Sequence, residues 1–355
     1  MTRLEKARAK MTAQGLDALI IYDELNVRYL SGLAFSDGFL FISAKRALLV
    51  TDFRYYEVAL RVAGGEFEIH NPEDRAVLIR SVISDGEIKT VGFEGDYLPF
   101  SRYTQLKETY CGISFVNIGS MIEDLRSLKS PDEILKLQAA QDITDKAFEH
   151  ILKILNPEHM TEKDVARELE YAMRKNGAEG FAFNTIAVSG DASSLPHGVP
   201  RDVKLQKGFL TMDFGAKLDG YCSDMTRTVV IGRADTEMKK LYNTVLSAQK
   251  AALDFLSAGV DAGEADKVAR DIINSDYNGT FGHSLGHGVG LYIHESPRIS
   301  KKSFGYKLRA GEIITVEPGI YVFGKHGCRI EDMVKIEDGG VYNFTHSPKE
   351  LIEIY

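Results

Sequence analysis

The feature that most constrains this chain is a pair of apolar runs, residues 209–214 and 225–231, joined by a short polar segment. The segment contains Asp219-Gly220, a dipeptide typical of tight turns between antiparallel strands. The stretch therefore predicts a β-hairpin. In that hairpin Asp213 lies inside the first strand, and Asp224 begins the second.

Two carboxylates on facing apolar strands raise an electrostatic problem. Each is costly to bury without a partner, and the two repel each other. A divalent cation between Asp213 and Asp224 removes both costs. The alternative is that Asp213 caps a turn and Asp224 faces water, and this stretch alone does not separate the two interpretations.

Bulk composition excludes several classes of protein. A length of 355 residues predicts two domains. The net charge of −8 leaves no general basic surface for nucleic acid. The longest apolar runs are too short to span a membrane, and the charged N-terminus has no apolar core of a secretory signal. The three cysteines are odd in number and widely spaced, so we expect a reducing, cytoplasmic setting.

The first third of the chain alternates short apolar runs with helical patterns, which predicts an α/β domain with a mixed or parallel sheet. We expect strands at residues 18–22, 39–42, 47–50, 67–69, 90–93 and 113–116. We expect helices at residues 4–14, 54–62, 75–83 and 101–109. No motif for catalysis or phosphate binding is found in this third.

A domain junction is expected around residues 122–132, which places the domains at 1–126 and 127–355. Ser130 precedes a proline and is followed three residues later by Glu133, the pattern of a capping box. A long helix is predicted from there to about residue 155. A second helix is predicted at 161–175, capped by Thr161. Further helices are predicted at 235–257 and 262–275.

The remaining two-thirds carry histidines in glycine-rich settings. His197 lies between a proline and a glycine, which predicts a rigid exposed loop; the alternative is a surface histidine without a role. Residues 282–295 hold three histidines and four glycines, so the backbone can approach a ligand closely there. His287 and His294 are seven apart, with a strand-like apolar run at 291–293.

Two glutamates follow in apolar surroundings. Glu317 and Glu331 each fall within an apolar run that predicts a strand, where glutamate is among the poorest residues. Together with Asp213, Asp224 and His287 they form a predicted metal site. Four carboxylates without thiolates suit two divalent ions, with Mn²⁺ and Co²⁺ fitting better than Zn²⁺ or Fe²⁺. Two such ions activate water for hydrolysis of an amide or related bond.

At this point the sequence resembles the pita-bread metallopeptidases, and among them the proline-specific Xaa-Pro dipeptidases (prolidases) and Xaa-Pro aminopeptidases. The resemblance rests on His283-Ser-Leu-Gly-His-Gly-Val-Gly-Leu-Tyr-Ile-His-Glu295 and on the blocks around Asp213–Thr228, Glu317 and Glu331. It implies an α/β creatinase-type N-terminal domain followed by an α+β pita-bread (creatinase/aminopeptidase-like) catalytic domain. It also implies a homodimer.

The resemblance further implies a role for each site residue. Asp213 is expected to bind one ion through both oxygens, Asp224 and Glu331 to bridge the ions, and His287 and Glu317 to complete the second. His197 and His294 are expected to contact substrate and stabilise the tetrahedral intermediate. Glu317 is the candidate proton donor, and Tyr321 the candidate wall of a proline pocket. Arg298 and Arg329 are candidates for binding the substrate carboxylate or orienting the ligands. His283 is expected to be structural, while His326 and His346 match no motif position.

The expected function is hydrolysis of the Xaa-Pro bond of dipeptides. The alternative is hydrolysis of that bond in longer peptides, as in an Xaa-Pro aminopeptidase. Methionine aminopeptidase shares the ligands but usually lacks such an N-terminal domain. Creatinase shares the domain plan but not the metal ligands. A non-catalytic peptide-binding relative would have lost ligands, whereas this chain keeps all five.

Overall fold

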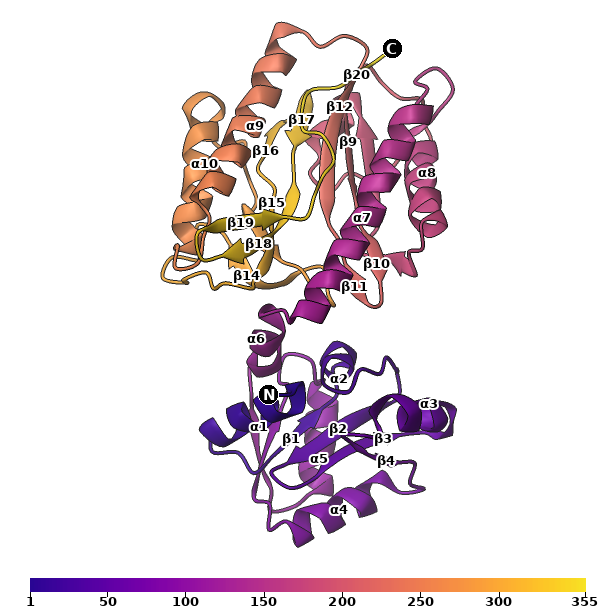
Figure 1. Cartoon of the computed structure of the whole chain (residues 1–355), viewed down its shortest axis with the longest axis vertical. Helices are drawn as coiled ribbons and strands as arrows, with labels where there is room; N and C mark the ends of the chain where they lie inside the picture. Colours follow the sequence, from indigo (N-terminus) through magenta and orange to yellow (C-terminus); the bar gives the residue numbers. More distant parts are fainter. The chain divides into compact units, whose positions relative to one another are not determined.

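The computed structural model describes all residues, 1–355, and separates into two compact units, Met1–Arg126 and Ser127–Tyr355. Figure 1 shows the helices and strands of each. None of the helices combines the length and the apolarity that a membrane crossing needs.

The N-terminal unit is a six-stranded mixed sheet in the order β4-β3-β2-β1-β5-β6, with β2 antiparallel to both of its neighbours. The strands are β1 (Ala18–Ile21), β2 (Gly38–Ser43), β3 (Ala47–Thr51), β4 (Glu68–His70), β5 (Thr90–Phe93) and β6 (Ser114–Asn117). The helices are α1 (Arg3–Ala13), α2 (Glu24–Ser31), α3 (Phe53–Ala63), α4 (Arg75–Asp85), α5 (Phe100–Thr109) and α6 (Met121–Ser127). Every predicted strand and helix of this unit is confirmed to within two residues, whereas α2 and α6 were not predicted.

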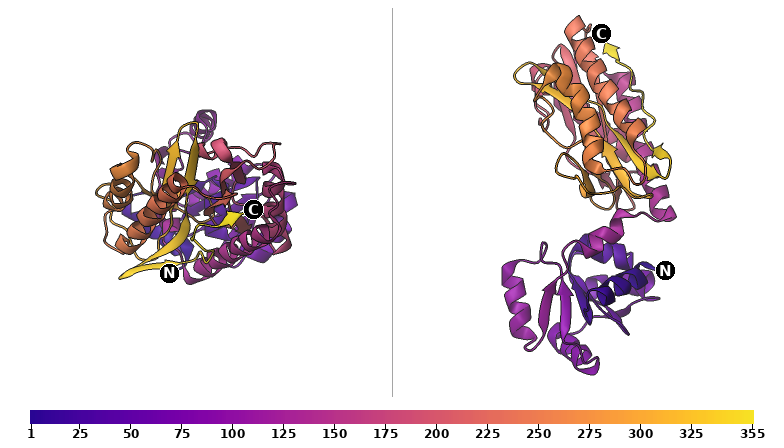
Figure 2. Two further views of the ribbon diagram at one scale, coloured as in Figure 1. Left: turned by 90° about the horizontal axis from the view of Figure 1, so that it is seen from above. Right: turned by 90° about the vertical axis from the view of Figure 1, so that its left-hand side faces the viewer.

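The C-terminal unit packs two helix pairs against several small sheets. Its helices are α7 (Pro131–Ile154), α8 (Glu162–Lys175), α9 (Thr236–Phe255), α10 (Ala262–Tyr277) and the 3₁₀ turn η1 (Gly190–Ser194). The predicted capping box of Ser130 with Glu133 and the predicted cap at Thr161 are confirmed, and Thr161 also forms a capping box with Asp164. The α7–α8 and α9–α10 pairs lie on opposite sides of the strands, and Figure 2 shows the α9–α10 pair covering them from another direction.

Four sheets fill the space between the helix pairs, in the orders β20-β12-β9-β8, β14-β13-β15-β18-β19, β11-β10-β7 and β16-β17. The first strands are β7 (Gly180–Phe181), β8 (Ile186–Ser189), β9 (Gly208–Phe214), β10 (Ala216–Leu218), β11 (Tyr221–Cys222) and β12 (Met225–Ile231). The later strands are β13 (Gly286–Gly288), β14 (Glu295–Ile299), β15 (Ile313–Val316), β16 (Gly319–Val322), β17 (His326–Arg329), β18 (Asp332–Glu337), β19 (Gly340–Asn343) and β20 (Glu353–Ile354).

The predicted hairpin is confirmed as a long ribbon. Strand β9 pairs with β12 over seven residues, and the turn falls at Asp219 and Gly220, with φ of 49° and 83°. Between β9 and the turn the ribbon is interrupted at Gly215, and its tip continues as β10 and β11 in a different sheet. A Cβ atom on Gly215 would lie 1.9 Å from the Ser223 carbonyl oxygen, so the break requires glycine.

Alternate residues of the ribbon face different cores. Leu210, Met212 and Phe214 pack into the core beneath α7 and α8, whereas Phe209 packs toward α9 and α10. Since side chains alternate along a strand, Asp213 points to the Phe209 side, away from the α7–α8 core. The alternation of side chains along β9 thus directs the Asp213 carboxylate toward the interior of the unit.

Candidate metal centre

Asp213 is a candidate ligand that lies inside a strand, near the end of β9. It pairs across the ribbon with Thr226 of β12. Its Oδ2 accepts a hydrogen bond from Arg329 Nη2 at 2.6 Å. Its Oδ1 is buried and has no hydrogen-bond partner among the protein atoms. A buried carboxylate oxygen without a donor is rare, because it forfeits its hydration without replacement.

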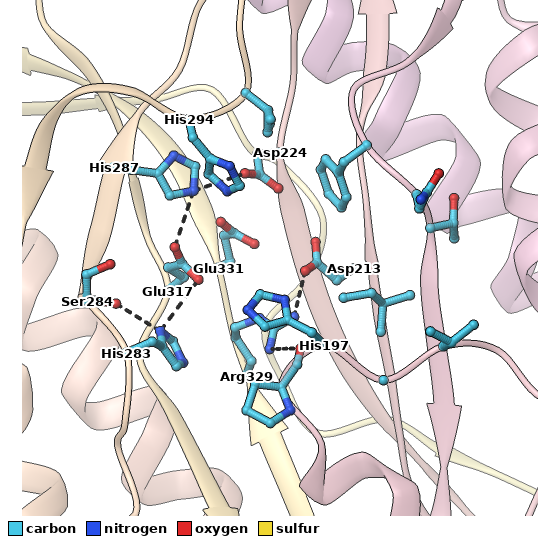
Figure 3. A pocket seen from close by; sticks show the side chains of 18 of the residues that line it. His197, Asp213, Asp224, His283, Ser284, His287, His294, Glu317, Arg329 and Glu331 are labelled. Atoms are coloured by element: carbon cyan, nitrogen blue, oxygen red, sulfur yellow. Dashed lines mark hydrogen bonds and ion pairs between the residues drawn. The ribbon is translucent and has the colours of Figure 1, made fainter. Parts of the chain in front are cut away.

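The other four candidate ligands lie around the same cavity. Ligand atoms of Asp224, His287 and Glu331 lie within 4.8 Å of one another. His287 Nε2 is 3.6 Å from Asp224 Oδ2 and 3.4 Å from Glu317 Oε1, as the dashed lines in Figure 3 show. All five candidates line one cavity of about 610 Å³. The structure therefore brings together side chains that are up to 118 positions apart in the sequence.

The elements that carry these side chains differ from the prediction. Glu317 and Glu331 were expected inside strands, but Glu317 follows β15 and Glu331 lies between β17 and β18. Asp224 likewise precedes β12 by one residue. For Glu317 the physical reason is Pro318, which has no N–H and cannot continue the β15 ladder. The run at 291–293 was also expected as a strand, and it is a bend leading into β14.

Burial and mutual repulsion dominate the electrostatics of the cavity. Burial raises the pKa of Asp224 well above its usual value, and the charges of Glu331, Asp213 and Glu317 raise it further. Burial likewise raises the pKa of Glu331, and it raises that of Glu317 to about 8. Burial lowers the pKa of His287 to about 3, which keeps the imidazole neutral and able to bind a cation.

These residues fit a divalent metal centre. The carboxyls share one buried space with a neutral imidazole, and Asp213 Oδ1 has no protein donor. Cations would supply the missing partner and would offset the repulsion that raises the carboxyl pKa values. The donors are hard oxygens and one nitrogen without thiolate, a set that suits divalent cations.

A hydrogen-bonded chain backs the cavity on the side of Arg329. Its Nη1 donates to the Tyr321 hydroxyl at 2.6 Å, and its Nε donates to Thr226 Oγ1 at 3.0 Å. The Tyr321 hydroxyl is also 3.1 Å from His283 Nε2. Tyr321 is not among the residues that line the cavity, so the structure does not bring it to the predicted proline pocket. Arg329 is buried and committed to these partners, which leaves Arg298 as the free guanidinium in the lining.

The predicted non-ligand histidines His197 and His294 both line the cavity. The ring of His294 lies 4.5 Å from that of His287, centroid to centroid, in an edge-on arrangement. Burial lowers the pKa of His294, and the charge of Arg298 lowers it further. His283 also lines the cavity. Its Nδ1 donates to the Ser284 carbonyl oxygen at 2.9 Å and lies 3.9 Å from Glu317 Oε2.

His326 and His346, which match no motif position, fall outside the cavity lining. His326 opens β17 with its ring edge-on to Phe209 at 5.8 Å, and the His346 backbone N–H donates to Asp145 Oδ2. Sequence reasoning missed the apolar part of the lining, which includes Phe183, Ile186, Val199 and Ile293. Ile293 is buried like a core residue, Phe183 and Ile186 are half-buried, and Val199 is 77% exposed, and the sequence carries no signal for such exposure.

The segment that carries His197 is held by a carboxylate that was not predicted to matter. Glu162, at the start of α8, is fully buried. It accepts hydrogen bonds from the backbone N–H and hydroxyl of Ser189 and from the backbone and guanidinium of Arg201. Ser189 and Arg201 flank residues 190–200, and so Glu162 closes the loop that presents His197 at its base.

Comparison with known proteins agrees with this geometry. The pattern of metallopeptidase family M24 matches residues 136–338, and that of the creatinase/prolidase N-terminal domain matches residues 3–128. An Xaa-Pro dipeptidase of Pyrococcus furiosus is 38% identical over 353 residues, covering 99% of each protein. The solved structure of an Xaa-Pro dipeptidase from Bacillus anthracis is 40% identical with a TM-score of 0.95, covering 99% of each chain. That of an X-Pro aminopeptidase from Thermotoga maritima is 36% identical with a TM-score of 0.90, covering 98% of this chain and 100% of that chain.

Proposed function

Because this chain belongs to metallopeptidase family M24, we propose that it is a metal-dependent peptidase that hydrolyses the Xaa-Pro bond of dipeptides. The observation that carries the proposal is the convergence of four carboxylates and His287 on one cavity, with Asp213 Oδ1 left without a protein partner. The relatives named Xaa-Pro dipeptidase, similar over 99% of the chain, support the substrate class. The units 1–126 and 127–355 are proposed as the creatinase-type N-terminal domain and the catalytic domain.

Each ligand has a proposed role. Asp213 would hold one of two divalent ions and His287 and Glu317 the other, while Asp224 and Glu331 would be shared by both. The proximity of Asp224 and Glu331 to His287 supports the shared position. We propose Mn²⁺ or Co²⁺, on the hardness of the donors, with Zn²⁺ or Fe²⁺ as alternatives. When bound, such a pair lowers the pKa of water and polarises a carbonyl.

The remaining side chains of the cavity act on the substrate. His197 and His294 reach the cavity from two different loops, and each donates to the oxygen of the scissile carbonyl as that oxygen gains charge. Glu317 would take a proton from the water that attacks the carbonyl carbon and pass it to the prolyl nitrogen, as the C–O bond forms and the C–N bond breaks. Arg298 binds the substrate carboxylate, since Arg329 is committed to Asp213, Tyr321 and Thr226. Tyr321 acts with Arg329 as a support for Asp213.

The apolar lining explains the preference for proline. The Xaa-Pro bond is a tertiary amide without an N–H, so an enzyme cannot recognise it through that donor. Phe183, Ile186 and Ile293 offer apolar surface at the cavity wall, where the pyrrolidine ring can be desolvated. Selectivity then comes from burying the ring, while Arg298 fixes the carboxylate.

The experiment that tests the function combines metal analysis with a peptide assay. Purified protein is stripped of metal and reconstituted with Mn²⁺ or Co²⁺. Hydrolysis of an Xaa-Pro dipeptide is expected only after reconstitution, with two ions bound per chain. Undiminished turnover in the metal-free protein would refute the proposal.

The second candidate function is that of an Xaa-Pro aminopeptidase. The similarity to the Thermotoga maritima X-Pro aminopeptidase over 98% of the chain supports it. Comparing cleavage of Xaa-Pro with cleavage of Xaa-Pro-Yaa-Zaa separates the two, because a dipeptidase leaves the tetrapeptide intact. A non-catalytic peptide-binding role is disfavoured, since none of the five ligands is missing.

The setting of the enzyme is part of the proposal. We propose a homodimer. The exposed apolar side chains of α3, which include Phe53, Tyr56, Leu60 and Val62, support it. Cytoplasmic placement is supported by three cysteines that are all free. Light scattering would measure the mass in solution, and a monomer would refute the dimer.

A further inference from the structure

Two buried threonine hydroxyls lie immediately behind the candidate ligands. Thr226 is in β12 and Thr315 is in β15, and both are fully buried. Each hydroxyl contacts one of the candidate ligand carboxylates, Glu331 in the first case and Glu317 in the second. Neither threonine lines the cavity, so neither can touch a substrate.

The direction of the Thr226 hydrogen bonds is fixed by chemistry. Its Oγ1 lies 3.0 Å from Arg329 Nε, and a guanidinium can only donate. The hydroxyl proton must therefore point elsewhere, and the acceptor in reach is Glu331 Oε2 at 2.7 Å. The backbone N–H of Glu331 also donates to the Thr226 carbonyl at 3.1 Å. Thr226 thus holds Glu331 by both main chain and side chain.

Thr315 repeats the arrangement on the other side of the cavity. Its Oγ1 accepts a hydrogen bond from the backbone N–H of His287 at 3.2 Å, so the hydroxyl proton must point away from that donor. The proton points to Glu317 Oε1 at 3.3 Å. The approach depends on Gly286, where a Cβ would lie 1.9 Å from the Thr315 carbonyl oxygen. One hydroxyl therefore links two ligands, His287 and Glu317.

We propose that Thr226 and Thr315 are the positioning residues of the metal centre, each ordering a different part of it. Thr226 orients Glu331 and, through Arg329, Asp213. Thr315 orients His287 and Glu317. In both cases the hydroxyl donates to the carboxylate oxygen, which favours the ionised form that a metal requires. The assignment of these parts to two separate ions rests on the proposed function.

Valine is the matched substitution, because it keeps the β-branched shape and removes only the hydroxyl. Groups behind metal ligands typically contribute about 10- to 100-fold to metal affinity. We expect Thr226→Val to lower the affinity for both ions by about that factor, because Glu331 is proposed to be shared by them. Thr315→Val should lower the affinity for one ion about 10-fold, the lower end of that range, because the hydrogen bond from Thr315 to Glu317 is the longer of the two. The affinity for the other ion should change by less than about twofold.

Calorimetric titration of the metal-stripped full chain with Mn²⁺ measures these affinities without any substrate, and the visible spectrum of the Co²⁺ form reports ligand geometry. Thr226→Ser and Thr315→Ser keep the hydroxyl and should bind Mn²⁺ like the wild type. Thr211→Val is the control, since Thr211 is equally buried in β9 and its hydroxyl contacts Thr228 and the Gly327 carbonyl rather than a ligand.

The outcomes separate this inference from the proposed function. Wild-type isotherms in both valine variants, or serine variants that lose as much affinity as the valine ones, would overturn the role of the hydroxyls. An altered Co²⁺ spectrum and weakened Mn²⁺ binding confined to the valine variants would support it. A wild-type chain that binds two ions but leaves Xaa-Pro peptides intact would refute the substrate class and leave the positioning roles standing.

Discussion

Replacing Glu162 by glutamine should destabilise the protein and loosen the His197 loop. The Glu162 carboxylate accepts five hydrogen bonds, from Ser189 and Arg201 only. Glutamine has the same shape, but its NH₂ group would face donors. Breaking a buried charged pair costs about 3–5 kcal/mol. Since the Arg201 side chain is 38% exposed, water compensates part of this loss, and we expect about 2–3 kcal/mol.

That loss should be seen in thermal unfolding and in turnover. For a domain of this size about 2–4 °C of melting temperature corresponds to each kcal/mol, which gives a decrease of about 4–12 °C. The kcat should also fall while metal content is retained, because Ser189 and Arg201 flank the segment that carries His197. Glu149→Gln is the matched control, since Glu149 pairs with Lys153 on the surface and both side chains are 67% exposed. It should change stability by less than about 0.5 kcal/mol.

The same substitution predicts a pH dependence with a definite sign. Burial pushes the pKa of Glu162 upward, but the hydrogen bonds from Arg201 and Ser189 outweigh it and hold the pKa below its ordinary value. A lowered folded-state pKa stabilises the fold above the unfolded value of about 4.3, and this contribution is lost as pH falls below it. The difference in unfolding free energy between wild type and Glu162→Gln should therefore shrink between pH 5 and pH 3. A difference that is absent at pH 7, or that stays constant into acid, would refute the reasoning.

Further predictions concern the cavity and the ribbon. Removal of metal should lower the melting temperature, because the buried carboxyls then repel one another. Asp224→Asn should bind neither ion. In calorimetry with chelator present, the metal-free variant should melt at a higher temperature than the metal-free wild type, because one of the repelling carboxyls is gone. His197→Ala should lower kcat by about 10²–10³-fold with metal content unchanged by elemental analysis, as expected for loss of one donor to the carbonyl oxygen. Gly215→Ala should cost more than about 2 kcal/mol in denaturant unfolding, since its Cβ would overlap the Ser223 carbonyl, whereas Gly339→Ala, in open space, should be tolerated.

The sequence predicted most of the fold where local chemistry decides structure. The capping box at Ser130, the cap at Thr161 and the turn at Asp219 need only neighbouring residues, and all are confirmed. Helix α2 was missed because one of its buried positions is polar. Asn26 is fully buried and donates to Glu94, so an apolar stripe is interrupted where the core requires a hydrogen bond instead.

The candidate site shows what periodicity alone cannot supply. Apolar residues on both sides of Glu317 and Glu331 favoured strand interiors, and the pattern has no signal for the point where a chain leaves one sheet for another. The structure places these glutamates at such points. A residue within a ladder must point to one face or the other, whereas a residue between two strands is free of that constraint.

That freedom explains how several sheets can serve one centre. Asp213 comes from the β9–β12 ribbon, His287 from β13, and the glutamates from the ends of β15 and β17. Contacts such as Thr226 with Glu331, 105 positions apart, then fix the free side chains from behind. Positions at strand ends let the glutamate side chains point toward the centre, and the buried hydroxyls hold those side chains in place. If this division holds, deleting a hydroxyl should damage metal affinity more than it damages unfolding free energy, whereas a ligand embedded in a ladder would lose both together.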